Sequence, residues 1–165
     1  MPKKYLALVV EDDPDLSAIF ASALQSAGFE TEIITDGGKA LARLVEVVPS
    51  LVILDLHLPH LSGANALRQI QADRRLLETR VVICTADAAM ADELRNQADL
   101  VLLKPVMYSQ MRDLAARLVP GVQGQAASAG HVFGLENIPQ TPARPTPGEQ
   151  APAVSAEEPG QTPSD

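Results

Sequence analysis

The chain has 165 residues, a mass of 17.5 kDa and a formal net charge of −8 at pH 7. This acidic balance argues against direct DNA or RNA binding, which needs a basic face that displaces counterions. Aromatic residues make up only 3% and Trp is absent, so a platform for stacking bases is not expected either.

The sequence predicts a protein of the cytoplasm. Its single cysteine, Cys84, cannot form an internal disulfide, which favours a reducing compartment. No apolar run approaches the roughly 20 residues of a membrane span. The apolar stretch near the start of the chain ends at Glu11 and is too short for a signal peptide. We therefore expect no membrane insertion.

Apolar runs and helical patterns alternate five times along the chain. The first strand is expected at residues 6–10, and the helix after it repeats apolar residues at the spacing of one helical face. Pro14 suits the first turn of this helix and Gly28 lies just after its end. The strand at 30–34 alternates polar and apolar residues, as edge strands do. The next helix is stopped by Pro49, and its apolar stripe comprises Leu41, Leu44, Val45 and Val48.

Three further strands follow, at residues 51–54, 80–84 and 100–103. The run 51–54 is apolar throughout, so both faces of this strand should be buried. The later helices are expected at 64–74, at about 88–96, and over a last stripe formed by Met107, Met111, Leu114 and Leu118. Strict alternation of strands and helices predicts an α/β fold, a doubly wound five-stranded parallel sheet with helices on both faces.

Composition changes sharply near Pro120. Residues 120–165 contain 8 Pro and 6 Gly, and they carry five acidic residues against one base, Arg144. Such a segment cannot bury enough apolar surface to offset the entropy of ordering it. We therefore expect one domain over residues 1–119 and a disordered tail over 120–165. The tail's apolar cluster at 131–138 is either a chance cluster or a short peptide that docks on a partner or back onto the domain.

Polar side chains follow the central strands, at the sheet edge where doubly wound folds bind ligands. Glu11 and Asp12 follow the first strand, Asp55 the third, Thr85 the fourth and Lys104 the fifth. Carboxylates crowded together resist full ionisation without a cation, and an all-oxygen pocket suits Mg²⁺. A divalent ion and a lysine beside an aspartate are what phosphoryl transfer to a carboxylate needs. The neighbouring Asp13 is equally well explained as a helix cap.

The chain resembles the receiver domain of two-component response regulators, the CheY-like family, over about residues 3–119. The matching segments are 9–16 (VVEDDPDL), 51–59 (LVILDLHLP), 62–63 (SG), 85–86 (TA) and 104–105 (KP). The resemblance implies a flavodoxin-like fold with strand order 2-1-3-4-5 and a Mg²⁺ cofactor. It also implies a histidine kinase or histidine phosphotransfer protein as the phosphoryl donor.

The resemblance assigns a role to each residue of the site. Asp55 would be the phosphoacceptor, and Thr85 and Lys104 would bind the phosphoryl group. Asp12 and Asp55 would ligate Mg²⁺ together with the backbone carbonyl of His57. Glu11 would act on the ion nearby, in part through water. The Lys104–Pro105 peptide would be cis.

The sequence departs from the family on the face that usually signals. Many receivers carry an aromatic residue three positions before the lysine, where this chain has Val101. The stretch from Thr85 to Lys104 is also about one helical turn shorter than the common pattern.

We expect a single-domain response regulator that is not an enzyme and signals to an unidentified downstream protein through protein contacts. The alternatives are a phosphocarrier within a multistep relay and an interaction module that works without phosphorylation.

Overall fold

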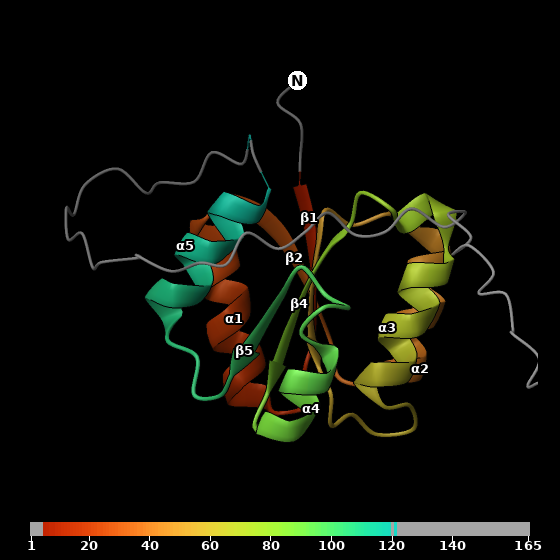
Figure 1. Ribbon diagram of the computed structural model, residues 1–165. Coiled ribbons are helices and arrows are strands. Elements are labelled where there is room, and N and C mark those ends of the chain that lie inside the picture. The colour runs from red at the N-terminus through yellow and green to blue at the C-terminus, as the bar shows by residue number, and fades with distance from the viewer. Residues whose placement is uncertain (1–4, 120, 122–165) are drawn as a thin grey trace, which may run out of the picture.

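The computed structural model describes residues 5–119 and 121. Five parallel strands form one sheet in the order β2-β1-β3-β4-β5, which confirms the predicted doubly wound fold (Figure 1). The strands are β1 (Tyr5–Val10), β2 (Phe29–Ile34), β3 (Leu51–Asp55), β4 (Arg80–Thr85) and β5 (Leu100–Leu103). The helices are α1 (Pro14–Ser26), α2 (Gly37–Glu46), α3 (Gly63–Ala72), α4 (Ala88–Leu94) and α5 (Tyr108–Leu118), with a 3₁₀ turn η1 (Arg74–Leu76). The expected tail lies outside the described residues, apart from Gly121.

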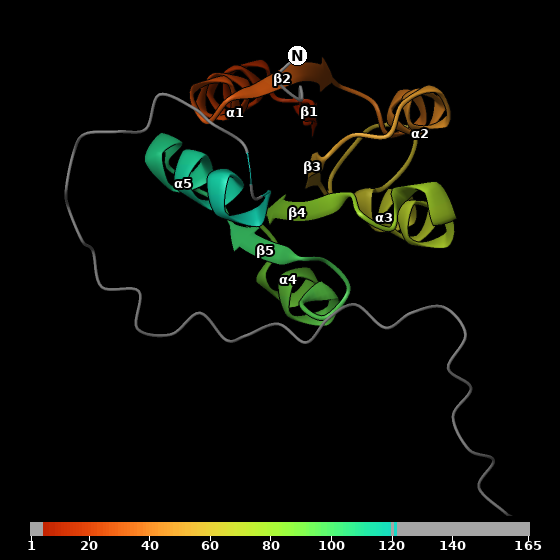
Figure 2. The same cartoon turned by 90° about the horizontal axis from the view of Figure 1, so that it is seen from above.

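The sheet separates two hydrophobic cores. Helices α1 and α5 cover one face, while α2 and α3 cover the other and α4 lies beside β5 (Figure 2). Successive residues of a strand point to opposite faces, so Leu51 and Ile53 enter the first core and Val52 and Leu54 the second. Every residue of β3 is buried, as expected for a central strand.

Four helices begin with a side chain that caps the backbone. The carboxylate of Asp13 accepts hydrogen bonds of 2.9 Å from the N–H groups of Asp15 and Leu16, and Pro14 is the first residue of α1. This confirms that Asp13 caps α1. The other side-chain caps are Asp36 for α2, Ser62 for α3 and Asp87 for α4. These caps fix where each loop at the carboxyl edge of the sheet ends.

The expected stripe of the second helix was partly wrong. Helix α2 ends at Glu46, so Val48 lies beyond it, and Val45 and Val48 are 70% and 54% exposed. The spacing of Val45 fits a helical face, but the core on this side is already filled by Leu44 and residues of α3. Helix α3 also ends at Ala72, because residues 74–76 tighten into η1.

The beginning of α5 differs as well. Met107 precedes the helix as its N-cap and is 66% exposed, whereas Met111 is buried.

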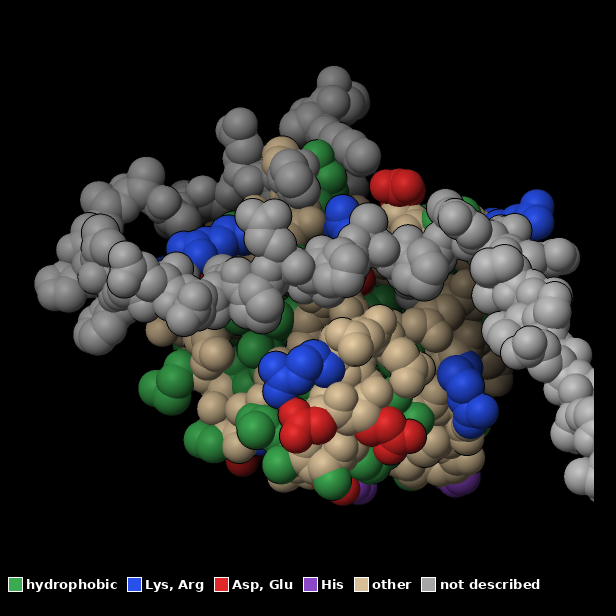
Figure 3. Space-filling view, in the orientation of Figure 1, with side chains coloured by type: hydrophobic (Ala, Val, Ile, Leu, Met, Phe, Trp, Pro, Cys, Tyr) green, Lys and Arg blue, Asp and Glu red, His purple; other side chains and the backbone are tan. Residues whose placement is uncertain are grey.

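Basic and acidic side chains lie next to one another on the face that carries α4 (Figure 3), where Arg95 forms an ion pair with Asp92. Within the part of the chain that the structure describes, every helix is too short or too polar to cross a membrane.

Candidate functional site

Three carboxylates meet at the carboxyl edge of the sheet. The register aligns Val10 of β1 with Leu54 of β3, so the residues that follow, Glu11 and Asp55, lie at the same level. One oxygen from each of Glu11, Asp12 and Asp55 lies within 4.8 Å of the others. Glu11 and Asp55 are buried, whereas Asp12 is exposed. The structure thus brings together the three acidic residues that the sequence predicted.

Lys104 completes this cluster from the end of β5. Its Nζ lies 2.9 Å from Asp55 Oδ2 and 2.8 Å from Glu11 Oε2. The backbone N–H of Lys104 donates to the carbonyl of Thr85 at 2.8 Å, which fixes the start of the loop after β5. The Lys104–Pro105 peptide is cis, as the resemblance implied. One ammonium group is therefore shared by two buried carboxylates.

The electrostatics of the cluster follow from its burial. Burial raises the pKa of Glu11, and the charge of Asp55 acts in the same direction, while contact with Lys104 opposes both. Burial by itself would lower the pKa of Lys104, but its contacts with Glu11 and Asp55 outweigh that effect and raise it. Lys104 therefore remains an ammonium group at neutral pH, and three carboxylates share a single positive charge.

The donor set fits a divalent cation. Glu11 Oε2 is buried, and its partner is the Lys104 ammonium at 2.8 Å, which it shares with Asp55. One ammonium group cannot balance the charge of three carboxylates within 4.8 Å of one another, so the cluster favours a further cation. Oxygen ligands from several carboxylates are those that Mg²⁺ prefers. Glu11, Asp12 and Asp55 could therefore hold this ion. The family resemblance implies the backbone carbonyl oxygen of His57 as a further ligand.

His57 and Thr85 lie on either side of the phosphoacceptor candidate. The backbone N–H of His57 donates to Asp55 Oδ1 at 3.1 Å, and the imidazole is exposed. Thr85 ends the strand next to β3 and is fully buried. Its Oγ1 accepts a hydrogen bond of 3.1 Å from the N–H of Asp87, so its own hydrogen remains available for a further acceptor.

The loop between β3 and α3 is anchored by contacts that sequence reasoning did not find. A Cβ built on Gly37 would lie 2.3 Å from the carbonyl oxygen of Leu61, so α2 and this loop approach each other at the backbone. Close by, the imidazole Nδ1 of His60 contacts the carboxylate of Asp36. His60 has a φ of 64°, in the left-handed region. The Gly37-Gly38 pair in the sequence was the only signal of this close approach.

Comparison with known proteins identifies the family. Residues 7–116 match the model of the response regulator receiver domain, so the chain belongs to this family. Over 114 residues it is 36% identical to the DNA-binding response regulator MtrA of Mycolicibacterium smegmatis, an alignment that covers 67% of this chain and 47% of MtrA. The chain thus spans about half the length of the curated relatives it matches.

Solved structures show the same fold. The chemotaxis response regulator CheY4 of Vibrio cholerae is 22% identical with a TM-score of 0.65, over 71% of this chain and 100% of that chain. The response regulator TrrA of Thermotoga maritima, solved in complex with Mg²⁺-BeF, is 24% identical with a TM-score of 0.63, over 70% of this chain and 99% of that chain.

The expected absence of direct DNA binding receives no support from these comparisons. Relatives at 31% to 36% identity are described as DNA-binding regulators. The acidic balance of the chain therefore remains the sole basis of that expectation.

Proposed function

We propose that Asp55 accepts a phosphoryl group in a Mg²⁺-dependent reaction, with a histidine kinase or a histidine phosphotransfer protein as the donor. The observation that carries this proposal is the position of Asp55 Oδ2, 2.9 Å from the Lys104 ammonium inside a cluster of carboxylates. Membership of the receiver family supports the same conclusion.

The chemistry is a single phosphoryl transfer. A carboxylate oxygen of Asp55 forms a bond to phosphorus as the bond from phosphorus to the donor's imidazole nitrogen breaks, and that nitrogen keeps the electron pair. Glu11, Asp12 and Asp55 would hold Mg²⁺, which when bound would neutralise charge on the phosphoryl oxygens. Lys104 pairs with one of these oxygens, and the Thr85 hydroxyl donates a hydrogen bond to another.

We propose that the phosphorylated protein signals by contact with another protein in the cytoplasm. It would act as a single-domain response regulator that is not itself an enzyme. The relay carrier remains the alternative within the same chemistry. A module that works without phosphorylation is disfavoured, because an interaction scaffold has no need of three carboxylates gathered around one lysine at Asp55.

Intact mass spectrometry tests the proposal directly. Incubated with acetyl phosphate and Mg²⁺, the chain should gain the mass of one phosphoryl group, and Asp55→Asn should abolish the gain. Asp92→Asn is the matched control, because Asp92 is a highly exposed residue of α4 whose carboxylate pairs with Arg95. Full labelling of Asp55→Asn would overturn the assignment.

Metal binding is tested separately by titration. Asp12→Ala should weaken Mg²⁺ binding at least tenfold, because one of only three charged ligands is lost. Asp15→Ala is the control, since Asp15 lies in the first turn of α1 and is also exposed. An unchanged affinity in Asp12→Ala would remove Asp12 from the site.

A further inference from the structure

A groove lies at the amino edge of the sheet, opposite the carboxylate cluster. It has a volume of about 390 Å³ and is formed by the starts of β1 and β4, the loop before β3 and the end of α5. We call it the amino-edge groove. One part of its wall is formed by Tyr5, Leu6, Val48, Pro49, Leu118 and Val119, and the polar residues Ser50, Glu78, Thr79 and Arg80 line the rest. Nothing in the phosphoryl-transfer chemistry uses this groove.

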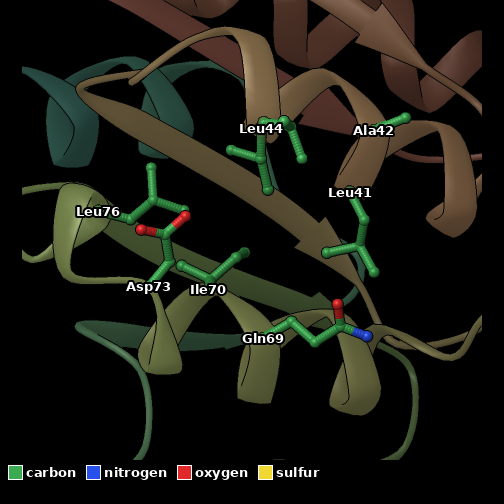
Figure 4. A pocket seen from close by; sticks show the side chains of 8 residues that line it. Leu41, Ala42, Leu44, Gln69, Ile70, Asp73 and Leu76 are labelled. Atoms are coloured by element: carbon green, nitrogen blue, oxygen red, sulfur yellow. The ribbon is translucent and has the colours of Figure 1, made fainter.

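Exposed aliphatic side chains continue from this groove toward a second one. Val48 lines the amino-edge groove, and Val45 lines a groove of about 240 Å³ between α2 and α3 (Figure 4). Leu41 and Leu44 of α2 and Ile70 of α3 make this second groove mainly aliphatic (Figure 4). Leu77 is 43% exposed and follows Leu76, which also lines the second groove.

The chain itself leaves the domain at the amino-edge groove. Leu118 and Val119, at the end of α5, form part of its wall. Gly121 has a φ of 96°, and a Cβ at this position would lie 2.7 Å from the hydroxyl oxygen of Tyr5. The positive φ favours glycine, and the Tyr5 hydroxyl is the nearest neighbour of this position. The backbone is therefore held against a residue that lines the groove at the point where the tail begins.

We propose that residues 131–138 of this chain dock into the amino-edge groove and across the exposed Val48. This segment reads HVFGLENI and is the only apolar cluster in residues 120–165. The nine residues 122–130 separate it from Gly121, and an extended spacer of that length spans up to about 30 Å. The segment can therefore reach the amino-edge groove, which begins at Tyr5 beside Gly121, and Phe133 and Leu135 are the side chains that would enter.

A tethered segment has an advantage over any separate partner. A short flexible spacer gives its segment an effective concentration of the order of millimolar, so weak apolar contacts suffice. Burial of a large aliphatic or aromatic side chain is favourable, and docking would cover Val48 as well. The proposal does not depend on phosphorylation, because the groove and Asp55 lie at opposite edges of the sheet.

Hydrogen exchange of the full chain tests the docking from both sides. In the double variant Phe133→Asp/Leu135→Asp, amides of residues 47–48 and 77–80 should exchange about tenfold faster than in the unmodified chain. Val154→Asp is the matched control within residues 120–165 and should leave these rates unchanged. Equal rates in the double variant and the unmodified chain would overturn the proposal.

The reciprocal variant is Val48→Asp, which should abolish slow exchange within residues 131–138. Ile19→Asp is its control, because Ile19 is similarly exposed, at 42%, but lies on α1. Protection that rises with protein concentration would show that the segment binds a second copy, which also contradicts docking within one chain. Phosphorylation by acetyl phosphate serves as a separate readout and should be equal in all four variants.

Discussion

Gly63 lies directly against the backbone of the phosphoacceptor candidate Asp55. A Cβ built on Gly63 would be 2.0 Å from the carbonyl oxygen of Asp55 and 2.7 Å from the Cα of Leu56. The N–H of Gly63 also donates to the carbonyl of Leu56 at 3.0 Å. The first turn of α3 is thus packed onto the end of β3, and only a residue without a side chain fits there.

Gly63→Ala should therefore destabilise the domain and displace the end of β3. Because the neighbouring atoms are backbone and cannot rotate away, we expect a loss of about 3 kcal/mol of unfolding free energy. Urea denaturation measures this loss, and the rate of phosphorylation by acetyl phosphate should fall with it. Gly38→Ala is the control, since its nearest neighbour at 3.2 Å is the end of the Asp36 side chain. Equal stability of both variants would contradict the packing argument.

Removal of the Lys104 side chain should lower the stability of the metal-free domain and increase its stabilisation by Mg²⁺. Its ammonium forms ion pairs with Glu11 and Asp55, so Lys104→Ala removes the positive charge that offsets part of the repulsion among three carboxylates. Without Mg²⁺ the variant should be less stable, and Mg²⁺ should raise its melting temperature more than that of the unmodified chain. Thermal unfolding with and without Mg²⁺ measures both effects.

Lys39→Ala provides the matched control for this experiment. Lys39 is an exposed residue in the first turn of α2, and its removal should change neither the stability nor the response to Mg²⁺. If Lys104→Ala and Lys39→Ala respond equally to Mg²⁺, the lysine does not compete with the metal for the carboxylates.

Cys84 should be inert in the native protein. Burial raises the pKa of its thiol to about 12, and the thiol is enclosed in the core between the sheet and α5. Since the ordinary value is 9.0, the thiolate fraction at pH 8 falls about a thousandfold. Labelling by iodoacetamide at this pH should be negligible until urea unfolds the chain. Ala42→Cys adds an exposed thiol as the reactive control, and rapid labelling of native Cys84 would contradict its burial.

The sequence was sufficient to predict the sheet and the cluster because both depend on short-range patterns. Apolar runs set the five strands, and the carboxyl ends of parallel strands meet at one edge, which brought Glu11, Asp55 and Lys104 together. The alternation of strands and helices along the sequence also predicted where each helical connection between strands begins. These features require only local periodicity and the handedness of crossovers.

Features that depend on contacts between distant loops could not be predicted. Val45 fits a helical stripe by spacing, but its exposure is decided by how α3 packs beside α2. The contact of His60 with Asp36 joins two loops 24 residues apart, and neither residue has a pattern around it that indicates a partner. The close approach of Gly121 to the hydroxyl of Tyr5 likewise joins the two ends of the domain.

Val101 should limit the conformational change that follows phosphorylation. It pairs with Ile83 in the sheet and packs, partly buried, against the core beneath α4, without a ring that could exchange between exposed and buried positions. The Thr85 hydroxyl can still turn toward a phosphoryl group, but position 101 offers no aromatic side chain to fill the space it leaves. Phosphorylation typically biases such switches by about 1–3 kcal/mol. Without the ring we expect a smaller structural change, concentrated in the loops after β3 and β4.

Hydrogen exchange with and without beryllofluoride, a phosphoryl mimic, measures the extent of this change. In the unmodified chain the exchange rates should change at residues 56–62 and 86–87 and stay constant in β5 and α5. Val101→Tyr, once shown by thermal unfolding to be folded, should extend the change into β5, because the added ring can move into the space beside Thr85. Asp55→Asn should show no response and is the control for binding of the mimic at the site. Large changes across β5 and α5 in the unmodified chain would show that the switch operates without the aromatic residue, because Thr85 alone would then transmit the signal.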